Sequence, residues 1–397
     1  MKFKISNSFK LLAVRLFVFM NKLIYLLFKT FTKVDNNLII FEGTMGRFDE
    51  SSWVFYHYLR EKRKYRFIWM VKRPEDMPTN EDTLFFNRYC FPNNIVAEYY
   101  YAKAGYSFYT HTTSATKYKR LGQKKIFFGH GYAIKAGKGN GRNIYNNFDF
   151  GLATGDGAIS TQALFVGCEP HELLPLGLPR NDLLIKNNGV GKDNPIVKDL
   201  SFKKLILWMP TFRDSTVNNL SESLCSTDTG LPLFDTEDKV VRLNSMLSQC
   251  DCVILLKIHR LQMKKTIFNK KYSNIVIITD KDIDAIHRQL YEIIGFSDAL
   301  LTDYSSVSVD YLLLDKPIGY ILNDMDYYKK DRGFTSDNPL DVMAGNYIYT
   351  EDDLYEFISD VLKGKDDSKE KRHLLVKKLH NAPNGNSCEL ISQKFNL

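Results

Sequence analysis

From Leu38 onward, short β-rich runs alternate with stretches of helical periodicity, and this alternation limits the folds open to the chain more than any other feature. The expected strands of the first half are Leu38–Phe41, Phe67–Val71, Ser107–Thr110, Lys125–Phe128 and Phe150–Thr154, with helices near Ser51–Lys64 and Ile95–Ala104. Strands that alternate with helices predict a parallel sheet with helices packed on both of its faces.

The same pattern restarts after the polar stretch Lys186–Asp199. The expected strands there are Leu205–Met209, Cys252–Ile258, Ile275–Ile278, Ala299–Leu301 and Pro317–Ile321, and the expected helices are Glu237–Cys250, Asp284–Phe296, Ser306–Leu314, Asp352–Lys363, Ser368–Lys378 and Cys388–Phe395. Single cores stop growing at about 250–300 residues, so the 397 residues predict two α/β domains, 35–195 and 196–397. The polar segment Asp214–Pro232 is expected to be a surface loop, either an acceptor lid or a tolerated insertion.

The net charge of +8 is concentrated at the N-terminus. Seven lysines and arginines precede the first acidic residue, Asp35, which leaves 47 basic and 46 acidic residues in the rest of the chain. A nearly neutral body argues against nucleic acid as a partner. The six cysteines form no CxxC pairs, which favours free thiols of a cytosolic protein over disulfides or zinc. No metal site and no cofactor are indicated.

The N-terminal segment, residues 1–34, predicts a helix that lies on a membrane surface. Arg15, Lys22 and Lys29 divide its apolar part into uncharged runs of six residues, well short of the roughly 18 that a membrane span needs. They recur every seven residues and so form one narrow stripe, which suits a helix whose lysines meet anionic headgroups. A helix docked on the protein's own core, or an uncleaved signal segment, are the alternatives.

Polar residues follow four of the expected strands directly. Gly129-His130-Gly131 follows the strand at Lys125–Phe128, Pro210 to Arg213 follow Leu205–Met209, His259-Arg260 follow Cys252–Ile258, and Thr302 to Ser306 follow Ala299–Leu301. Ligands of open α/β sheets bind beyond the carboxyl ends of the strands. We therefore expect these segments to converge on one cleft between the two domains.

Two of these segments suggest particular chemistry. An imidazole suits proton transfer near neutral pH, so His130, flanked by two glycines, is the candidate general base; a purely structural histidine is the alternative. Ser305 and Ser306 stand at the start of an expected helix, where hydroxyls and free N–H groups can hold a phosphate. Ordinary N-capping is the alternative for these serines.

Several blocks, in this order, resemble the CDP-glycerol glycerophosphotransferases, the family of teichoic acid primases and polymerases. They are Phe128-Gly129-His130-Gly131, Gly177-Leu178-Pro179-Arg180-Asn181-Asp182, Met209-Pro210-Thr211-Phe212-Arg213-Asp214, Leu256-Lys257-Ile258-His259 and Leu301-Thr302-Asp303-Tyr304-Ser305-Ser306-Val307-Ser308-Val309-Asp310. The likeness runs from about Leu38 to the C-terminus, and the blocks together are specific although each alone is weak.

The resemblance implies a GT-B architecture, in which two Rossmann-like domains face each other across a cleft and the C-terminal domain binds a CDP-linked donor. It also implies peripheral attachment to the cytoplasmic face of a bacterial membrane and a polyprenyl-diphosphate-linked saccharide as acceptor. Carried over by position, His130 is similar to the family's base, and Arg213, His259, Ser305 and Asp310 are similar to its donor-site residues. The expected catalytic residues are thus His130 and His259, and the expected substrate-binding residues are Arg213, Thr302, Ser305, Ser306 and Asp310, of which Ser306 rests on the helix argument and Thr302 on its place at the end of a strand.

The expected reaction is the transfer of a polyol phosphate from CDP-glycerol or CDP-ribitol to an acceptor hydroxyl, with release of CMP. A GT-B glycosyltransferase that uses a nucleotide-sugar is the nearest alternative, because the same fold serves many functions. A non-catalytic membrane or nucleic-acid binder is a second alternative, supported by the basic N-terminus.

Overall fold

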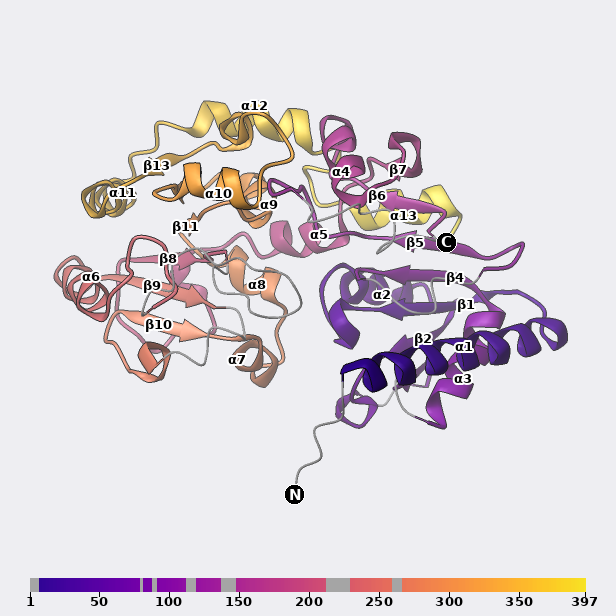
Figure 1. Ribbon diagram of the computed structural model, residues 1–397. Helices are drawn as coiled ribbons and strands as arrows, with labels where there is room; N and C mark the ends of the chain where they lie inside the picture. The colour runs from indigo at the N-terminus through magenta and orange to yellow at the C-terminus, as the bar shows by residue number, and fades with distance from the viewer. Residues whose placement is uncertain are drawn as a thin grey trace, which may run out of the picture.

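Two parallel sheets organise the computed structural model, which describes residues 7–78, 81–87, 91–111, 119–136, 148–211, 229–258 and 266–397 (Figure 1). The first sheet holds β1 (Asp35–Glu42), β2 (Arg66–Met70), β3 (Thr83–Phe86), β4 (Ala104–Tyr109), β5 (Lys124–Phe127), β6 (Phe150–Leu152) and β7 (Leu173–Leu174). The second holds β8 (Lys204–Trp208), β9 (Cys252–Lys257), β10 (Ile275–Ile278), β11 (Ala299–Thr302), β12 (Ile318–Ile321) and β13 (Asn346–Ile348).

Both sheets have the strand order of a Rossmann fold. The first runs β3-β2-β1-β4-β5-β6-β7 and the second β10-β9-β8-β11-β12-β13. The order therefore reverses between β1 and β4 in one sheet and between β8 and β11 in the other, and such switch points open a crevice at the carboxyl ends of the strands. The expected GT-B-like architecture of two doubly wound domains is confirmed.

Each sheet is buried on both faces because successive side chains of its strands point to opposite sides. In β1, Ile39 and Phe41 pack on one face while Leu38 and Ile40 pack on the other. In β8, Leu205 and Leu207 face one core and Ile206 and Trp208 the other. The near-continuous apolar runs in the sequence reflect this double burial.

Thirteen helices connect and cover the strands of the described chain. They are α1 (Asn7–Phe31), α2 (Glu50–Glu61), α3 (Asn93–Lys103), α4 (Ile159–Val166), α5 (Pro179–Lys186), α6 (Glu237–Gln249), α7 (Asp280–Ala285), α8 (Leu290–Gly295), α9 (Val307–Tyr311), α10 (Met325–Asp331), α11 (Glu351–Lys363), α12 (Lys369–Leu379) and α13 (Ser387–Phe395). Helix α5 lies between the two lobes, where it contacts α2 on one side and α8 on the other (Figure 1).

The N-terminal helix α1 lies along α3, and one of its faces is docked on the first domain (Figure 1). Tyr25 is buried and Asn21 accepts a hydrogen bond from the side-chain amide of Asn94 at 2.9 Å. The exposed side of the helix is nevertheless apolar; it carries Leu16, Phe19, Met20, Leu23, Leu26, Leu27 and Phe31. Within the described residues, no helix has the length and apolar character needed to cross a membrane.

The structure departs from the sequence expectations at several elements. The strands β3, β7 and β13 and the helices α4, α5 and α10 were not expected. The single helix expected over Asp284–Phe296 is wrong: the chain breaks at His287, whose φ is +53°, and restarts as α8 from a capping box of Gln289 and Glu292.

The last helix leaves the second lobe. Helix α13 lies against the strands of the first sheet (Figure 1). Its residues Ile391 and Phe395 belong to the same buried core as Ile39 and Phe41 of β1. The core of the first domain therefore combines segments that are far apart in the sequence.

Candidate functional site

His130 follows β5 in a turn that requires glycine on both sides. Gly129 and Gly131 have φ values of +73° and +88°, a left-handed conformation that residues with a Cβ rarely adopt. The imidazole is half-buried, and its ring centroid lies 5.5 Å from that of His111, which follows β4 at the switch point of the first sheet. Burial lowers the pKa of His130 to about 4; Glu50 opposes this shift, and His111 adds to it. The imidazole is therefore neutral, and able to accept a proton, over the physiological pH range.

Two buried side chains at the end of β11, those of Thr302 and Asp303, join the ends of neighbouring strands. Thr302 donates its hydroxyl to the carbonyl oxygen of Met209, at the end of β8, over 2.7 Å. The carboxylate of Asp303 accepts hydrogen bonds from the backbone N–H and the hydroxyl of Thr211. Because Thr302 is buried and its hydroxyl is donated within the protein, the structure gives it a supporting position, and its contact with substrate stays a prediction.

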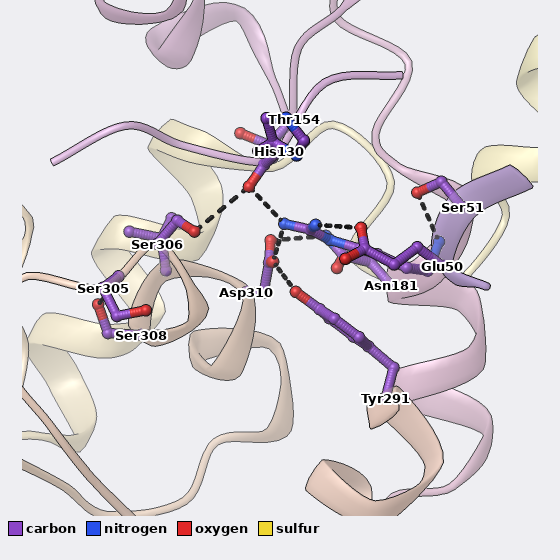
Figure 2. Close-up of polar contacts among 12 residues, drawn as sticks. Glu50, Ser51, His130, Thr154, Asn181, Tyr291, Ser305, Ser306, Ser308 and Asp310 are labelled. Carbon is purple, nitrogen blue, oxygen red and sulfur yellow. Dashed lines mark hydrogen bonds and ion pairs between the residues drawn. The ribbon is translucent and has the colours of Figure 1, made fainter. Parts of the chain in front are cut away.

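The two serines that follow reach the surface of the site. Ser305 and Ser306 are half-buried, and the hydroxyl of Ser306 donates to the carbonyl oxygen of His130 over 3.2 Å (Figure 2). Ser306 occupies the N-cap position of α9, yet its side chain makes no capping hydrogen bond. Simple N-capping therefore does not account for Ser306, and its hydroxyl instead connects the second domain to the turn that bears His130.

Asp310 lies beneath this contact and is completely buried. Its carboxylate accepts hydrogen bonds from Arg180 Nη2 at 2.7 Å, from the hydroxyl of Tyr291 at 2.6 Å and from the side-chain amide of Asn181 at 3.2 Å (Figure 2). Three donors are enough to satisfy a buried carboxylate. The structure thus places Asp310 as a support of the site, and its predicted contact with the donor stays a prediction.

Arg180 connects this carboxylate to the first domain. Its guanidinium donates through Nη2 to the carbonyl oxygen of His130 at 2.8 Å, and through Nη1 it contacts Glu50 at 3.2 Å (Figure 2). Burial alone would lower the pKa of Arg180, but Asp310, Tyr291 and Glu50 raise it above its ordinary value. Arg180 therefore carries a permanent positive charge directly under the candidate base.

A cavity of about 110 Å³ lies between the lobes beside this network. Arg180, Glu50 and Tyr291 belong to its lining. Arg47, from the first lobe, crosses to the second, with Nη1 3.0 Å from Asp280 and Nη2 2.8 Å from Asp284. The two lobes thus meet through charged groups next to the site.

Arg213 and His259 lie outside the described residues, as does most of the expected loop Asp214–Pro232. Their predicted roles therefore stay predictions. The described residues nearest to them in sequence are Thr211, which follows β8, and Ile258; the neighbouring Lys257 pairs with Asp280 at 2.9 Å. Within the described part of the chain, no group of three or more His, Cys, Asp or Glu side chains is placed to hold a metal ion.

Three residues of the site had no role assigned from the sequence. Arg180 belongs to a recognised block, and that membership could have drawn attention to it. Glu50 and Tyr291 gave no such signal, because each sits in a helical segment of ordinary composition and meets Arg180 only through the packing of α2 and α8 around α5.

The family model of the CDP-Glycerol:Poly(glycerophosphate) glycerophosphotransferases matches residues 24–395. A solved structure of the wall teichoic acid polymerase TagF superposes with a TM-score of 0.74 and 23% sequence identity, over 98% of this chain and 94% of that one. Similarity at this level of identity shows a shared fold.

Two curated relatives extend the match. A teichoic acid glycerol-phosphate transferase of Staphylococcus aureus (strain NCTC 8325 / PS 47) is 24% identical over 398 residues, which cover 93% of this chain and 96% of that protein. A teichoic acid ribitol-phosphate primase of Bacillus spizizenii is 27% identical over 195 residues, which cover 48% of this chain and 45% of the primase. The match thus spans about half the length of that relative.

Proposed function

The chain belongs to the CDP-Glycerol:Poly(glycerophosphate) glycerophosphotransferase family, and from that premise we propose that it is a polyol-phosphate transferase. It transfers the polyol phosphate from a CDP-linked donor to a hydroxyl of a lipid-linked acceptor, and glycerol phosphate is the first candidate for the group transferred. The observation that carries the proposal is the contact between His130 and Ser306. The hydroxyl of Ser306 meets the backbone carbonyl of His130, so the turn that bears a neutral imidazole in the first domain lies against the hydroxyl-bearing turn of the second, where donor and acceptor can meet. The product is teichoic acid or a related capsule polymer.

In the proposed reaction, the imidazole of His130 accepts the proton of the acceptor hydroxyl. The hydroxyl oxygen then forms a bond to the β-phosphorus of the CDP-polyol, and the bond between this phosphorus and the bridging oxygen breaks, so that CMP leaves with the bonding electron pair. Phosphoryl transfer depends chiefly on positioning and on stabilising negative charge. We assign that task to Ser305 and Ser306 together with Arg213 and His259.

The charge of the substrate also affects the base. An imidazole with a pKa of about 4 is a weak base, and the best general base has a pKa near the working pH. A bound diphosphate places negative charge near His130 and raises its pKa, because a nearby opposite charge favours the protonated form. Donor binding would thus bring the pKa of His130 closer to the working pH.

We assign the acceptor to the first domain, residues 35–195, and the CDP-linked donor to the second, residues 196–397. The acceptor is a polyprenyl-diphosphate-linked saccharide, and the protein works at the cytoplasmic face of the cell membrane. Helix α1 supports the proposed location at the membrane. Its undocked side exposes large apolar residues, among them Phe31 with 80% of its surface exposed, and Lys22 and Lys29 are also exposed. Such a surface suits insertion at the level of anionic headgroups.

The release of nucleotide tests the proposed donor. The protein is incubated with lipid-linked disaccharide, with and without a first glycerol phosphate, and with CDP-glycerol, CDP-ribitol, a UDP-sugar or a GDP-sugar. Acceptor-dependent release of CMP supports polyol-phosphate transfer, and the two acceptors separate primase from polymerase activity. Release of UDP or GDP with no release of CMP would replace the proposal by a nucleotide-sugar glycosyltransferase.

A further inference from the structure

We propose that Arg180 is a positioning residue for the reaction, one that holds the His130 turn against the donor domain. The inference rests on the proposed function, in which His130 is the base. Arg180 does not act on the substrate itself. It acts through the peptide group of His130 and makes the position of the imidazole depend on contact between the two domains.

The contacts of Arg180 fix its guanidinium group from several directions. Nη2 donates both to the carbonyl oxygen of His130, at 2.8 Å, and to Asp310, at 2.7 Å, while Nη1 contacts Glu50 at 3.2 Å. The ring of Tyr291 packs against the guanidinium, with 4.8 Å between Cζ and the ring centroid. With 5% of its side chain exposed, the group is rigid and shielded from water. A planar guanidinium can satisfy such a set of partners, whereas a lysine ammonium cannot.

The turn that carries His130 needs this support. Glycines with positive φ on both sides leave its backbone with more freedom than other residues would. Its carbonyl oxygen accepts hydrogen bonds from Arg180 and from Ser306. Since the carbonyl and the imidazole belong to the same residue, fixing one restricts where the other can lie.

The partners of Arg180 come from both domains. His130 follows a strand of the first sheet, Asp310 follows β11 of the second, and Arg180 itself lies on α5, which packs between α2 and α8. The guanidinium therefore bridges the His130 turn and the donor domain in the arrangement seen here. A misplacement of about 1 Å in a reacting group can lower a rate about a hundredfold. Loss of this bridge would therefore lower the rate by displacing His130.

Gly131 shows how closely the turn approaches Arg180. A Cβ atom added at Gly131 would lie 2.4 Å from Arg180 Nη2, and the next nearest atom would be an oxygen of Asp310, at 3.4 Å. A Cβ atom added at Gly129 would instead meet nothing closer than 3.6 Å. Both glycines have positive φ, so alanine at either position causes a similar backbone strain, but only alanine at Gly131 displaces the guanidinium.

Arg372 provides a matched control because it is an equally buried arginine remote from the site. It lies on α12 and contacts two carboxylates, with Nη1 2.9 Å from Asp366 and Nη2 3.1 Å from Asp315. Both partners belong to the second lobe. Replacement by lysine at Arg372 thus copies the loss of a buried forked contact without touching the His130 turn.

The test compares Arg180→Lys and Arg372→Lys in the full chain by steady-state kinetics with CDP-glycerol. We expect Arg180→Lys to lower kcat about a hundredfold and to leave the KM for CDP-glycerol within about threefold, with kcat of Arg372→Lys also within about threefold of wild type. A kcat of Arg180→Lys within threefold of wild type, or an equal loss in both variants, would overturn the proposal.

A second readout does not depend on turnover. Diethylpyrocarbonate modifies exposed imidazoles, and mass spectrometry gives the rate at His130. That rate should change at least about threefold in Arg180→Lys and stay unchanged in Arg372→Lys. A changed rate in a protein that releases no CMP would refute the proposed function but not the positioning, whereas an unchanged rate would refute the positioning.

If Arg180→Lys does not fold, the two glycine variants take its place. Gly131→Ala should lose at least about ten times more kcat than Gly129→Ala, because only the former moves the guanidinium. Equal losses would show that backbone strain, and not Arg180, controls the turn.

Discussion

The hydroxyl of Ser306 lies 3.2 Å from the carbonyl oxygen of His130, although 176 residues separate the two in the chain. This hydrogen bond joins the segment after β11 of the second sheet to the segment after β5 of the first. The hydroxyl of Ser306 has a single proton, which it donates to this carbonyl oxygen, so its side chain supports the base. In the proposed reaction it is the backbone N–H of Ser306, at the start of α9, that faces the phosphate. A small substitution of the side chain therefore tests the support of the base alone.

Ser306→Ala should lower kcat/KM for CDP-glycerol about twofold to tenfold. The reason is the loss of the hydrogen bond from its hydroxyl to the carbonyl oxygen of His130, about 0.5–1.5 kcal/mol. Steady-state CMP release measures the effect. Ser245→Ala removes a similar bond, from a serine hydroxyl to a backbone carbonyl on α6, and should leave activity unchanged. Wild-type activity of Ser306→Ala would show that this hydrogen bond does not support the base.

The sequence predicted the sheets well because their signal is local. Apolar runs such as Leu205–Met209 are bounded by polar turns, and double burial makes them conspicuous. The two-residue strand β7 and the edge strand β13 bury little and left no such signal. The break at His287 was missed because a left-handed residue inside a helical pattern depends on its tertiary surroundings.

The site was predictable only in part. Ligands of open α/β sheets bind beyond the carboxyl ends of the strands, and this rule predicted that His130 and Ser306 lie at one crevice. The rule needs only the order of strands and turns, which the sequence shows. It could not distinguish a side chain that faces the crevice from one that faces the core. Thr302 and Asp310 share the segment of Ser306 but are buried beneath it, and their burial follows from partners such as Arg180, far away in the sequence.

Asp310→Ala should destabilise the protein by about 3 kcal/mol. Removing one member of a buried ion pair leaves the other charge uncompensated, at a cost of about 3–5 kcal/mol, and Glu50 remains beside Arg180 to reduce that cost. Denaturant-induced unfolding measures the change. In the exposed pair Lys203–Asp251, Lys203→Ala should change stability by less than about 0.5 kcal/mol. Equal effects of the two variants would contradict the role given to the buried pair.

The pH dependence of kcat/KM tests the state of His130, because this constant reports the free enzyme. A base with a pKa of about 4 is neutral from pH 5.5 to 7.5, so His130 should add no acid limb in that range. A histidine with an ordinary pKa would instead lower kcat/KM tenfold for each pH unit below about 6.5. An acid limb near pH 6.5 that belongs to His130 would contradict the effect of burial.

The same shift predicts the sign of a stability effect. Between pH 6.5 and 4 the unfolded chain protonates His130 while the folded protein keeps it neutral, so the contribution of His130 to stability is complete above about pH 6.5 and is lost as the pH falls toward 4. The difference in thermal midpoint between wild type and His130→Gln should therefore shift against wild type as the pH is lowered through this window. A difference that does not vary with pH would contradict the lowered pKa.

Helix α1 can be tested apart from catalysis. Phe19→Glu and Leu23→Glu place charge on its exposed apolar side, and each should weaken binding to phosphatidylglycerol vesicles about tenfold or more, since burial of one large apolar side chain contributes about 1.5–3 kcal/mol. Sedimentation with vesicles gives the affinity. Leu164→Glu changes a leucine on α4 that is also exposed and should bind like wild type. Unchanged binding of the α1 variants would remove this helix from the membrane contact.

The most direct test of the central claim is acceptor-dependent CMP release from CDP-glycerol by wild type and by His130→Ala, with donor affinity measured on the same preparations by calorimetry. We expect release by wild type, a loss of at least about a thousandfold in kcat for His130→Ala, in line with the removal of a general base, and a dissociation constant for CDP-glycerol within about threefold of wild type. Turnover by His130→Ala at the wild-type rate, with intact donor binding, would contradict the assignment of His130 as the base.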